Sequence, residues 1–140
     1  MSLFFFSNYN SPKSMAFTLH PQITALFYWS SIDVQIRMKA YIKKTSKLFN
    51  NEYFKNRSKH KNALAISSNQ SQLIPTYDDV VIKYNHILET ENLLECPNFW
   101  GGFAFIPYYF EFWRGHESRI NKRDVYQING NTWDHEIIQP

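Results

Sequence analysis

Apolar and polar residues alternate strictly along residues 33–43, which is the clearest pattern in the chain. Successive side chains of a strand point to opposite faces of a sheet, so the alternation predicts a strand with one core face and one polar face. Gln35 lies on the polar face, where a ligand can reach it. The core face would carry Val34, Ile36, Met38, Ala40 and Ile42.

Shorter apolar clusters bounded by turn residues predict the other strands. Residues 3–7 show little alternation, which is typical of a strand buried on both faces, and residues 22–29 are rich in Ile, Phe, Tyr and Trp. Asn129-Gly130 is a hairpin-turn signal. The remaining strands are predicted at residues 103–106, 109–114, 123–128 and 132–138.

Helical periodicity occurs between these strands. Ser11 followed by Pro12 is a typical helix start, and His20-Pro21 would end that helix near Leu19. A strand-rich chain with intervening helices but no βαβ rhythm favours a partly open antiparallel barrel. Further helices are predicted at residues 46–57, 62–67 and 78–92, with inward positions Leu48, Phe49, Tyr53 and Phe54 in the first and Val80, Val81, Tyr84, Ile87 and Leu88 in the last.

Length, cysteine content and hydropathy narrow the class of protein. At 140 residues the chain should form one domain, and its single Cys96 cannot form an internal disulfide, which favours a reducing compartment such as the cytoplasm. The apolar start at residues 1–6 is too short for a membrane span and lacks the features of a signal peptide. We therefore expect no membrane partner. The five His share no metal-ligand spacing, so no metal site is expected either.

The net charge of +3 is unevenly distributed along the chain. Residues 37–61 contain nine Lys or Arg and a single acid, Glu52, whereas residues 77–95 contain five acids and one Lys. A basic segment can bind nucleic acid or phosphate. Because no nucleic-acid-binding motif accompanies it, we interpret most of these lysines as a solvated face and expect no nucleic-acid partner.

Residues 97–123 carry the strongest functional signal, with the sequence P-N-F-W-G-G-F-A-F-I-P-Y-Y-F-E-F-W-R-G-H-E-S-R-I-N-K-R. Arg119, Asn121 and Arg123 are spaced by two, so in an extended strand they would share one face. Guanidinium groups match phosphate and carboxylate oxygens, and the aromatic surface beside them suits a flat, phosphorylated ligand. The alternative is that the arginines form surface ion pairs and that Trp113 is a core residue.

This segment resembles the C-terminal signature of pyridoxine/pyridoxamine 5'-phosphate oxidases. The resemblance lies in W-G-G-F, followed by P, then E-F-W-x-G and R-x-x-x-R. The closing Trp133…Ile138-Gln139-Pro140 resembles the family's terminal W…L-x-P. The resemblance implies a mainly β (α+β) antiparallel split β-barrel of the FMN-binding type with peripheral helices. It also implies a single domain over residues 1–140 and a homodimer with FMN at its interface, residues 97–140 forming the dimerisation and FMN-signature region.

The resemblance also implies which residues contact FMN. Phe5-Phe6-Ser7-Asn8 resembles the family's F-Y-T-N, and Ser11-Pro12-Lys13 resembles its S-R-K. Val34-Gln35-Ile36 resembles R-Q-V, and Gln70-Ser71 resembles a Q-S pair. The implied cofactor-binding residues are Phe6, Ser7, Lys13, Gln35, Gln70, Ser71, Trp113 and Arg123.

Substrate contacts are implied in the same way. Tyr53-Phe54 and Arg57 resemble Y-F-x-x-R, whose Tyr and Arg bind the substrate phosphate, and Lys61 stands where the family usually has a serine. Arg119 matches the arginine that lies over the substrate, so it is the implied catalytic residue, with Asn121 beside it. The implied reaction, in vitamin B6 metabolism, oxidises pyridoxamine or pyridoxine 5'-phosphate to pyridoxal 5'-phosphate, with O2 as acceptor and H2O2 released.

Three departures from the family pattern qualify this interpretation. Pro12 replaces a phosphate-binding arginine, and Asn121 replaces a substrate-contacting histidine. Family members also carry an earlier stretch with an R-x-x-L-L-K segment, so we expect an N-terminally shortened split barrel. These departures leave two alternatives open: an FMN- or pyridoxal-phosphate-binding paralogue without turnover, and a dimerisation fragment without ligand.

Overall fold

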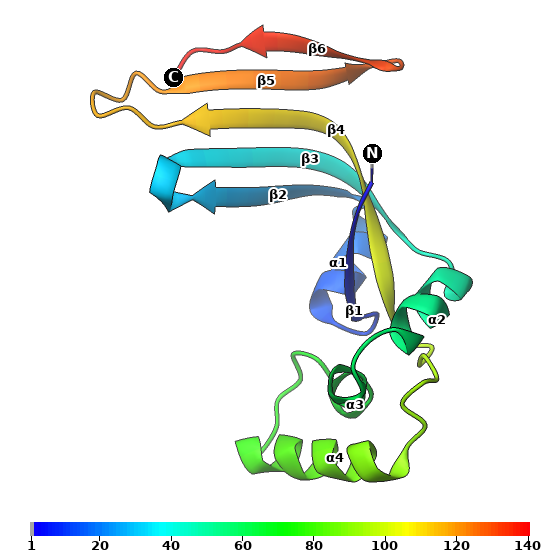
Figure 1. Ribbon diagram of the computed structural model, residues 1–140. Helices are drawn as coiled ribbons and strands as arrows, with labels where there is room; N and C mark the ends of the chain where they lie inside the picture. The colour runs from blue at the N-terminus through cyan, green and yellow to red at the C-terminus, as the bar shows by residue number, and fades with distance from the viewer. Residues whose placement is uncertain (1) are drawn as a thin grey trace. The chain divides into compact units, whose positions relative to one another are not determined.

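The computed structural model describes residues 2–140, and Figure 1 shows its strands and helices. Most of the predicted elements are present within one to three residues of their predicted ends. The strands are β1 (Leu3–Asn8), β2 (Gln22–Trp29), β3 (Val34–Lys44), β4 (Trp100–Arg114), β5 (Lys122–Asn129) and β6 (Thr132–Ile137). The helices are α1 (Pro12–Leu19), α2 (Lys47–Lys55), α3 (Lys59–Ser67) and α4 (Tyr77–Thr90), with a 3-10 turn η1 (Ser30–Ile32).

The sheet has the order β2-β3-β4-β5-β6, and β1 pairs with β4. The chain divides into two compact units. The sheet unit contains residues 2–3, 20–42 and 105–140, and the helical unit contains residues 4–19 and 43–104. The pairings of β2 with β3, β4 with β5 and β5 with β6 are antiparallel, in agreement with the predicted strand-rich α+β class.

The core of the sheet unit lies on the face that the alternation predicted. Met38, Ala40 and Ile42 are at most 5% exposed. Asn129 pairs with Thr132 across the β5–β6 hairpin, and Gly130 has φ +59° at the first turn position. A type II′ turn needs a positive φ at this position, and glycine adopts it without strain.

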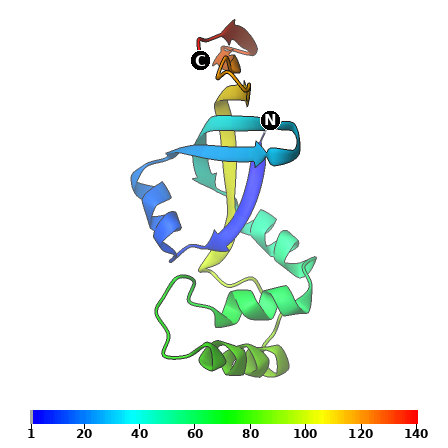
Figure 2. The same ribbon diagram turned by 90° about the vertical axis from the view of Figure 1, so that its left-hand side faces the viewer.

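The helical unit is built around β1, which runs alongside the first part of β4 (Figures 1 and 2). Helices α2 and α3 begin at side-chain caps, because Ser46 accepts from Phe49 N and Ser58 accepts from Lys61 N. A capping box starts α4. These caps satisfy backbone N–H groups that have no partner inside the helix. The buried apolar side chains of this unit are Phe54, Ala63, Leu93, Trp100, Phe103 and Ala104.

The helices are less buried than their periodicity predicted. In α2 only Phe54 of the four inward positions is buried, and Leu48 is 78% exposed. Among the described residues, helix α4 has none that is buried. Its predicted inward side chains are nevertheless less exposed than the rest of the helix, with the exception of Val81. Phe4 is half exposed, so β1 is not buried on both faces. Periodicity marks a preferred face, but how deeply that face is covered depends on tertiary partners.

The region from Trp100 to Lys122 differs from its predicted strands in two ways. β4 is continuous through Pro107, where a break was predicted. Pairing of β4 with β5 begins at Tyr109, so Pro107 precedes that ladder and its missing N–H costs no hydrogen bond there. The second difference is that residues 115–121 form a loop rather than an extended strand.

The W-G-G-F motif allows a close approach of backbone and side chains. A Cβ at Gly101 would lie 2.2 Å from Tyr9 Oη and 2.4 Å from Asn50 Nδ2. Asn50 is buried and donates to Tyr9 Oη, and its Oδ1 accepts from Gly102 N. A side chain at this position would therefore disrupt a buried hydrogen-bond network.

We expect Gly101→Ala to lower the free energy of unfolding by about 1–3 kcal/mol, because the added methyl group overpacks this network. Urea titration followed by far-UV circular dichroism measures the change. Asn131→Ala, at an exposed position of the β5–β6 turn, is the control and should change the free energy of unfolding by less than about 0.5 kcal/mol. Equal stability of the two variants would contradict the packing argument.

Candidate functional site

A buried carboxylate organises the sheet unit around two arginines. Glu111 is 4% exposed. Its Oε1 accepts from Arg123 Nε at 2.8 Å and lies 2.7 Å from Arg123 Nη2. Its Oε2 accepts from Arg37 Nη2 and, at 3.1 Å, from Tyr109 Oη. We call these four residues the arginine cluster.

Electrostatics keep Glu111 ionised. Burial alone would raise the pKa of its carboxyl group, but hydrogen bonds from Arg123 and Arg37 outweigh burial, so the net pKa is lowered. A lowered folded-state pKa means that the ionised carboxylate stabilises the fold above the unfolded pKa. That contribution is lost as the pH falls through the lower folded-state value.

Strand register places the predicted flavin residues of the sheet unit beside this cluster. Trp113 is directly opposite Arg123 in the β4–β5 ladder, and Glu111 lies two residues before Trp113 on the same face. Gln35 lies two residues before Arg37 on β3, so it shares the face of Arg37. Gln35, Trp113 and Arg123 are therefore gathered on one face of the sheet unit.

The loop between β4 and β5 holds Arg119 and Asn121, which were predicted to alternate with Arg123 on a strand face. That prediction is wrong, because Arg119 has φ +61° and its backbone N donates to His116 O. Asn121 Oδ1 accepts from His116 N at 3.1 Å. Both residues lie in the closed loop that precedes β5, which starts at Lys122.

The helical unit brings together Phe6, Tyr53 and Arg57 around Trp100. The rings of Phe6 and Tyr53 stack at 3.6 Å with an interplanar angle of 9°, and Phe6 also stacks on Trp100 at 5.2 Å. The Arg57 guanidinium carbon lies 4.5 Å from the Trp100 ring centroid. Trp100 thus supports the guanidinium through a cation–π contact.

One nitrogen of the half-buried Arg57 guanidinium lacks a hydrogen-bond partner within residues 2–140. Its Nη1 is buried and has no hydrogen-bond partner among the described residues. Burial lowers the pKa of this guanidinium, opposed only by Tyr53 and Cys96. A buried N–H group without a hydrogen-bond partner is costly, and a phosphate oxygen would supply the missing acceptor.

A second polar group of the helical unit surrounds Ser7. Gln70 Oε1 accepts from Ser7 Oγ at 2.9 Å and from Asn8 N at 3.2 Å, and Ser7 is buried. Ser71 follows with φ +69° in a turn. Lys13 on α1 and Lys61 on α3 are exposed. The structure thus joins Ser7 with Gln70, whereas Lys13 and Lys61 lie exposed on separate helices.

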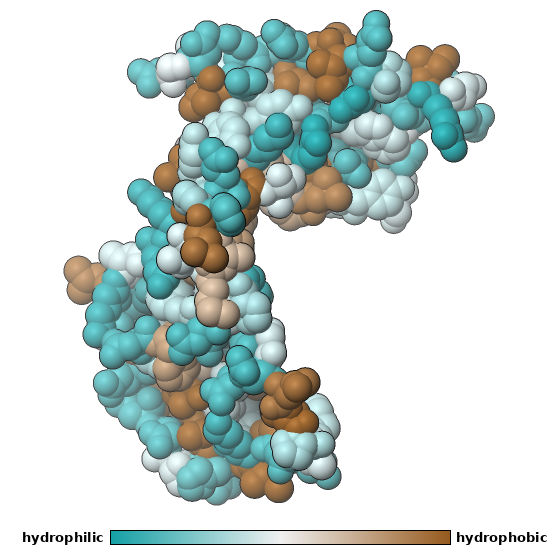
Figure 3. Space-filling view, turned by 180° about the vertical axis from the view of Figure 1, so that it is seen from behind, coloured by the Kyte–Doolittle hydropathy of each residue, from teal (hydrophilic) through white to brown (hydrophobic). Residues whose placement is uncertain are grey.

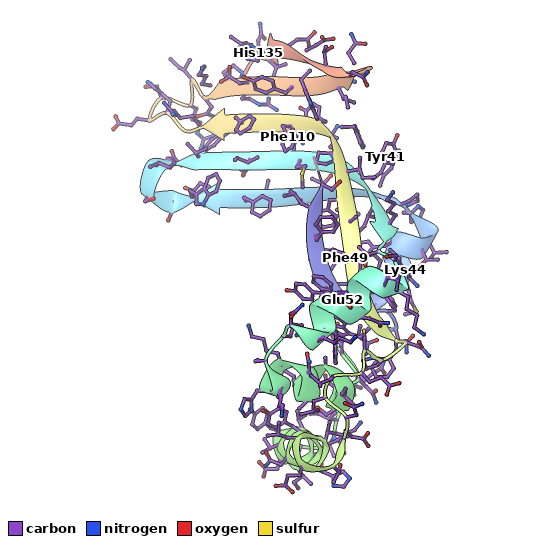
Figure 4. All side chains as sticks on the ribbon, turned by 45° about the vertical axis from the view of Figure 1, so that its right-hand side comes forward. Tyr41, Lys44, Phe49, Glu52, Phe110 and His135 are labelled. Atoms are coloured by element: carbon purple, nitrogen blue, oxygen red, sulfur yellow. The ribbon has the colours of Figure 1, made fainter. Side chains whose placement is uncertain are left out.

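Large apolar side chains remain at the surface of the sheet unit (Figure 3). A cavity of about 840 Å³ lies over β4, β5 and β6. Phe110 on β4 and His135 on β6, labelled in Figure 4, line it together with Phe112, Tyr126 and Trp133. This face has the character of a contact surface for another protein chain.

Glu111, Arg37 and Trp100 were not among the candidate site residues predicted from the sequence. The signal for Glu111 was available, because it is a lone carboxylate two positions before Trp113 on a strand. Within residues 2–140 no group of His, Cys, Asp and Glu could hold a metal ion. In the same range no helix is long and apolar enough to cross a membrane.

The fold is that of the FMN-binding split-barrel proteins. Two solved structures align with this chain: PhzG from Burkholderia lata 383 in complex with tetrahydrophenazine-1-carboxylic acid, and a pyridoxamine 5'-phosphate oxidase-related, FMN binding protein from Nostoc punctiforme PCC 73102. The first has a TM-score of 0.87 at 23% identity and covers 98% of this chain and 68% of its own. The second has a TM-score of 0.77 at 13% identity, and the alignment covers 99% of this chain and 72% of the Nostoc protein. At these identities the likeness shows the fold alone.

Sequence comparison adds the family. Residues 100–140 match the family model described as "Pyridoxine 5'-phosphate oxidase C-terminal dimerisation region". The pyridoxine/pyridoxamine 5'-phosphate oxidase of Vesicomyosocius okutanii subsp. Calyptogena okutanii (strain HA) is 32% identical over 143 residues, covering 97% of this chain and 65% of the relative. That of Acinetobacter baylyi (strain ATCC 33305 / BD413 / ADP1) is 31% identical, covering 97% and 64%. The chain belongs to the pyridoxine/pyridoxamine 5'-phosphate oxidase family, and it spans about 65% of the length of such relatives.

Proposed function

We propose that this protein carries out the FMN-dependent oxidation of pyridoxamine or pyridoxine 5'-phosphate to pyridoxal 5'-phosphate, with release of H2O2. The observation that carries this proposal is the buried, unpartnered Nη1 of Arg57 beside Tyr53. These two residues correspond to the phosphate-binding pair implied by the family resemblance. A dianionic phosphate offers the acceptor that the guanidinium lacks.

Each unit, taken by itself, contains side chains suited to parts of FMN. In the sheet unit, Trp113 offers an aromatic surface, and Arg123 and Gln35 offer hydrogen-bond donors on the same face. In the helical unit, Ser7 and Gln70 form a fixed polar pair. The proposed cofactor residues are Phe6, Ser7, Lys13, Gln35, Gln70, Ser71, Trp113 and Arg123.

Each remaining proposed residue has a binding or orienting role. When bound, FMN supplies the two-electron acceptor for the substrate C–H bond, and O2 is the final acceptor. Tyr53, Arg57 and Lys61 would hold the substrate phosphate. Arg119 would orient the substrate, with Asn121 able to hydrogen-bond but unable to carry a proton at neutral pH.

We further propose that the protein is a single-domain homodimer that associates through residues 97–140. The match to a dimerisation region over residues 100–140 supports this. The half-exposed aromatic side chains of Phe112 and Trp133 give that region an apolar surface to bury. Light scattering coupled to size-exclusion chromatography would measure the mass of the assembly.

The oxidase proposal predicts that the purified chain, given FMN, acquires flavin absorbance and converts pyridoxamine 5'-phosphate to pyridoxal 5'-phosphate with one H2O2 per product. Unphosphorylated pyridoxamine is the control substrate, and it should react far more slowly because it offers no phosphate to Arg57. Spectrophotometry and a coupled peroxidase assay follow both products. A protein that stays colourless and forms no pyridoxal 5'-phosphate would refute the proposal.

One observation favours a second candidate function, a flavin- or pyridoxal-phosphate-binding protein without turnover. Asn121 Oδ1 is engaged by the backbone of its own loop, and no imidazole is present at this position. Calorimetry that detects tight FMN or pyridoxal 5'-phosphate binding, with no H2O2 formed, would support this candidate. A dimerisation fragment without ligand would instead show no thermal shift with either compound.

A further inference from the structure

We propose that Glu111 is a positioning residue for the flavin site, because it holds the Arg123 guanidinium beside Trp113 for an electron-rich edge of the cofactor. This inference rests on the proposed function. It adds a residue that the sequence motif contains but to which no role is assigned. Every contact that carries it lies within the sheet unit.

The first step concerns the geometry of Arg123. Its Nε and Nη2 both approach Glu111 Oε1, at 2.8 Å and 2.7 Å, and its Nη1 donates to Gln139 O at 3.0 Å. A guanidinium has five N–H donors. With one donor used on each of these three nitrogens, two remain, one on Nη1 and one on Nη2. Glu111 and Gln139 thus fix the plane of the guanidinium and leave two donors for a ligand.

The second step concerns charge. Glu111 binds both Arg37 and Arg123, so the arginine cluster contains two guanidinium groups and one carboxylate. One positive charge remains in excess. Arg37 Nε is also buried without a hydrogen-bond partner among the described residues. The cluster is therefore suited to an anionic or electron-rich acceptor beside Trp113.

The third step concerns why a carboxylate occupies this position. Buried ion pairs often contribute little net stability, because desolvation offsets much of their attraction. A carboxylate that receives four donors still restricts both arginine side chains to one arrangement. Pre-organised donors bind a ligand more tightly than mobile ones, since less rotamer entropy is lost on binding.

The test compares FMN dissociation constants, measured by calorimetry, for the wild type, Glu111→Gln, Arg123→Leu and the double variant. We expect Glu111→Gln to weaken FMN binding about 10- to 100-fold, in line with the loss of hydrogen bonds to a charged group. If Glu111 acts through Arg123, the substitution should add little in the Arg123→Leu background. Glu117→Gln is the matched control, because Glu117 is exposed in the neighbouring loop, and it should change the constant less than 2-fold.

A second measurement, made on the same variants without FMN, tests the position of the Arg123 side chain directly. In ¹⁵N-labelled protein the Arg123 Nε–H resonance, assigned by its loss in Arg123→Leu, should be protected from solvent exchange in the wild type and the control, but not in Glu111→Gln. A wild type that binds no FMN would refute the proposed function. Full FMN affinity in a folded Glu111→Gln variant, or equal effects in both backgrounds, would overturn the positioning role.

Discussion

Replacing Phe103 with alanine is expected to lower the free energy of unfolding by about 3–5 kcal/mol, the range for truncating a buried phenylalanine. Phe103 is 2% exposed in the helical unit. Its ring stacks on Phe5 at 5.3 Å and meets Tyr9 and Phe17 edge-on at 5.4 Å and 5.2 Å. The variant would leave a cavity lined by three rings, which cannot collapse without moving β1 and α1.

Phe4→Ala is the control for this prediction, because Phe4 lies on the same strand as Phe5 but is 50% exposed. Its truncation should cost clearly less, since less of its ring is removed from water on folding. Urea titrations of both variants at the same pH measure the difference. Comparable losses would mean that the Phe103 cluster does not form the core of the helical unit.

The elements of the fold were predictable because local signals agreed with the tertiary outcome. Alternation around Met38 and Ala40 and the Ser11-Pro12 helix start correspond to β3 and α1. The loop at residues 115–121 could not be predicted from spacing alone. Its conformation depends on the Asn121 bond to His116 N and on the left-handed backbone of Arg119, a conformation uncommon for a non-glycine residue.

The sequence pattern named candidate site residues, but it did not specify how they are arranged. The motif spacing pointed to Trp113 and Arg123, and register indeed places them opposite each other. It did not reveal that Glu111 and Arg37 meet across strands far apart in sequence, because nothing local encodes that pairing. The exposed positions of α2 and α4 have the same cause, since burial is decided by packing partners that periodicity does not specify.

Unlike Phe103→Ala, which should lose stability, Arg57→Met should lose activity and keep its stability. We expect its kcat/KM for pyridoxamine 5'-phosphate to fall about 30- to 1,000-fold, since losing one partner of a desolvated charge pair costs about 2–4 kcal/mol. Its free energy of unfolding without ligand should stay equal or rise. The substitution removes a buried guanidinium nitrogen that has no partner, while the methionine stem can still pack on Trp100.

Lys59→Met is the matched control for Arg57→Met, because it removes a nearby positive charge at the exposed start of α3. It should leave kcat/KM within about 2-fold, since an exposed, screened charge contributes little to a buried contact. Steady-state assays with phosphorylated and unphosphorylated substrate separate the two effects. An Arg57→Met variant that loses stability, or that loses activity equally toward both substrates, would show that Arg57 supports the fold rather than the phosphate.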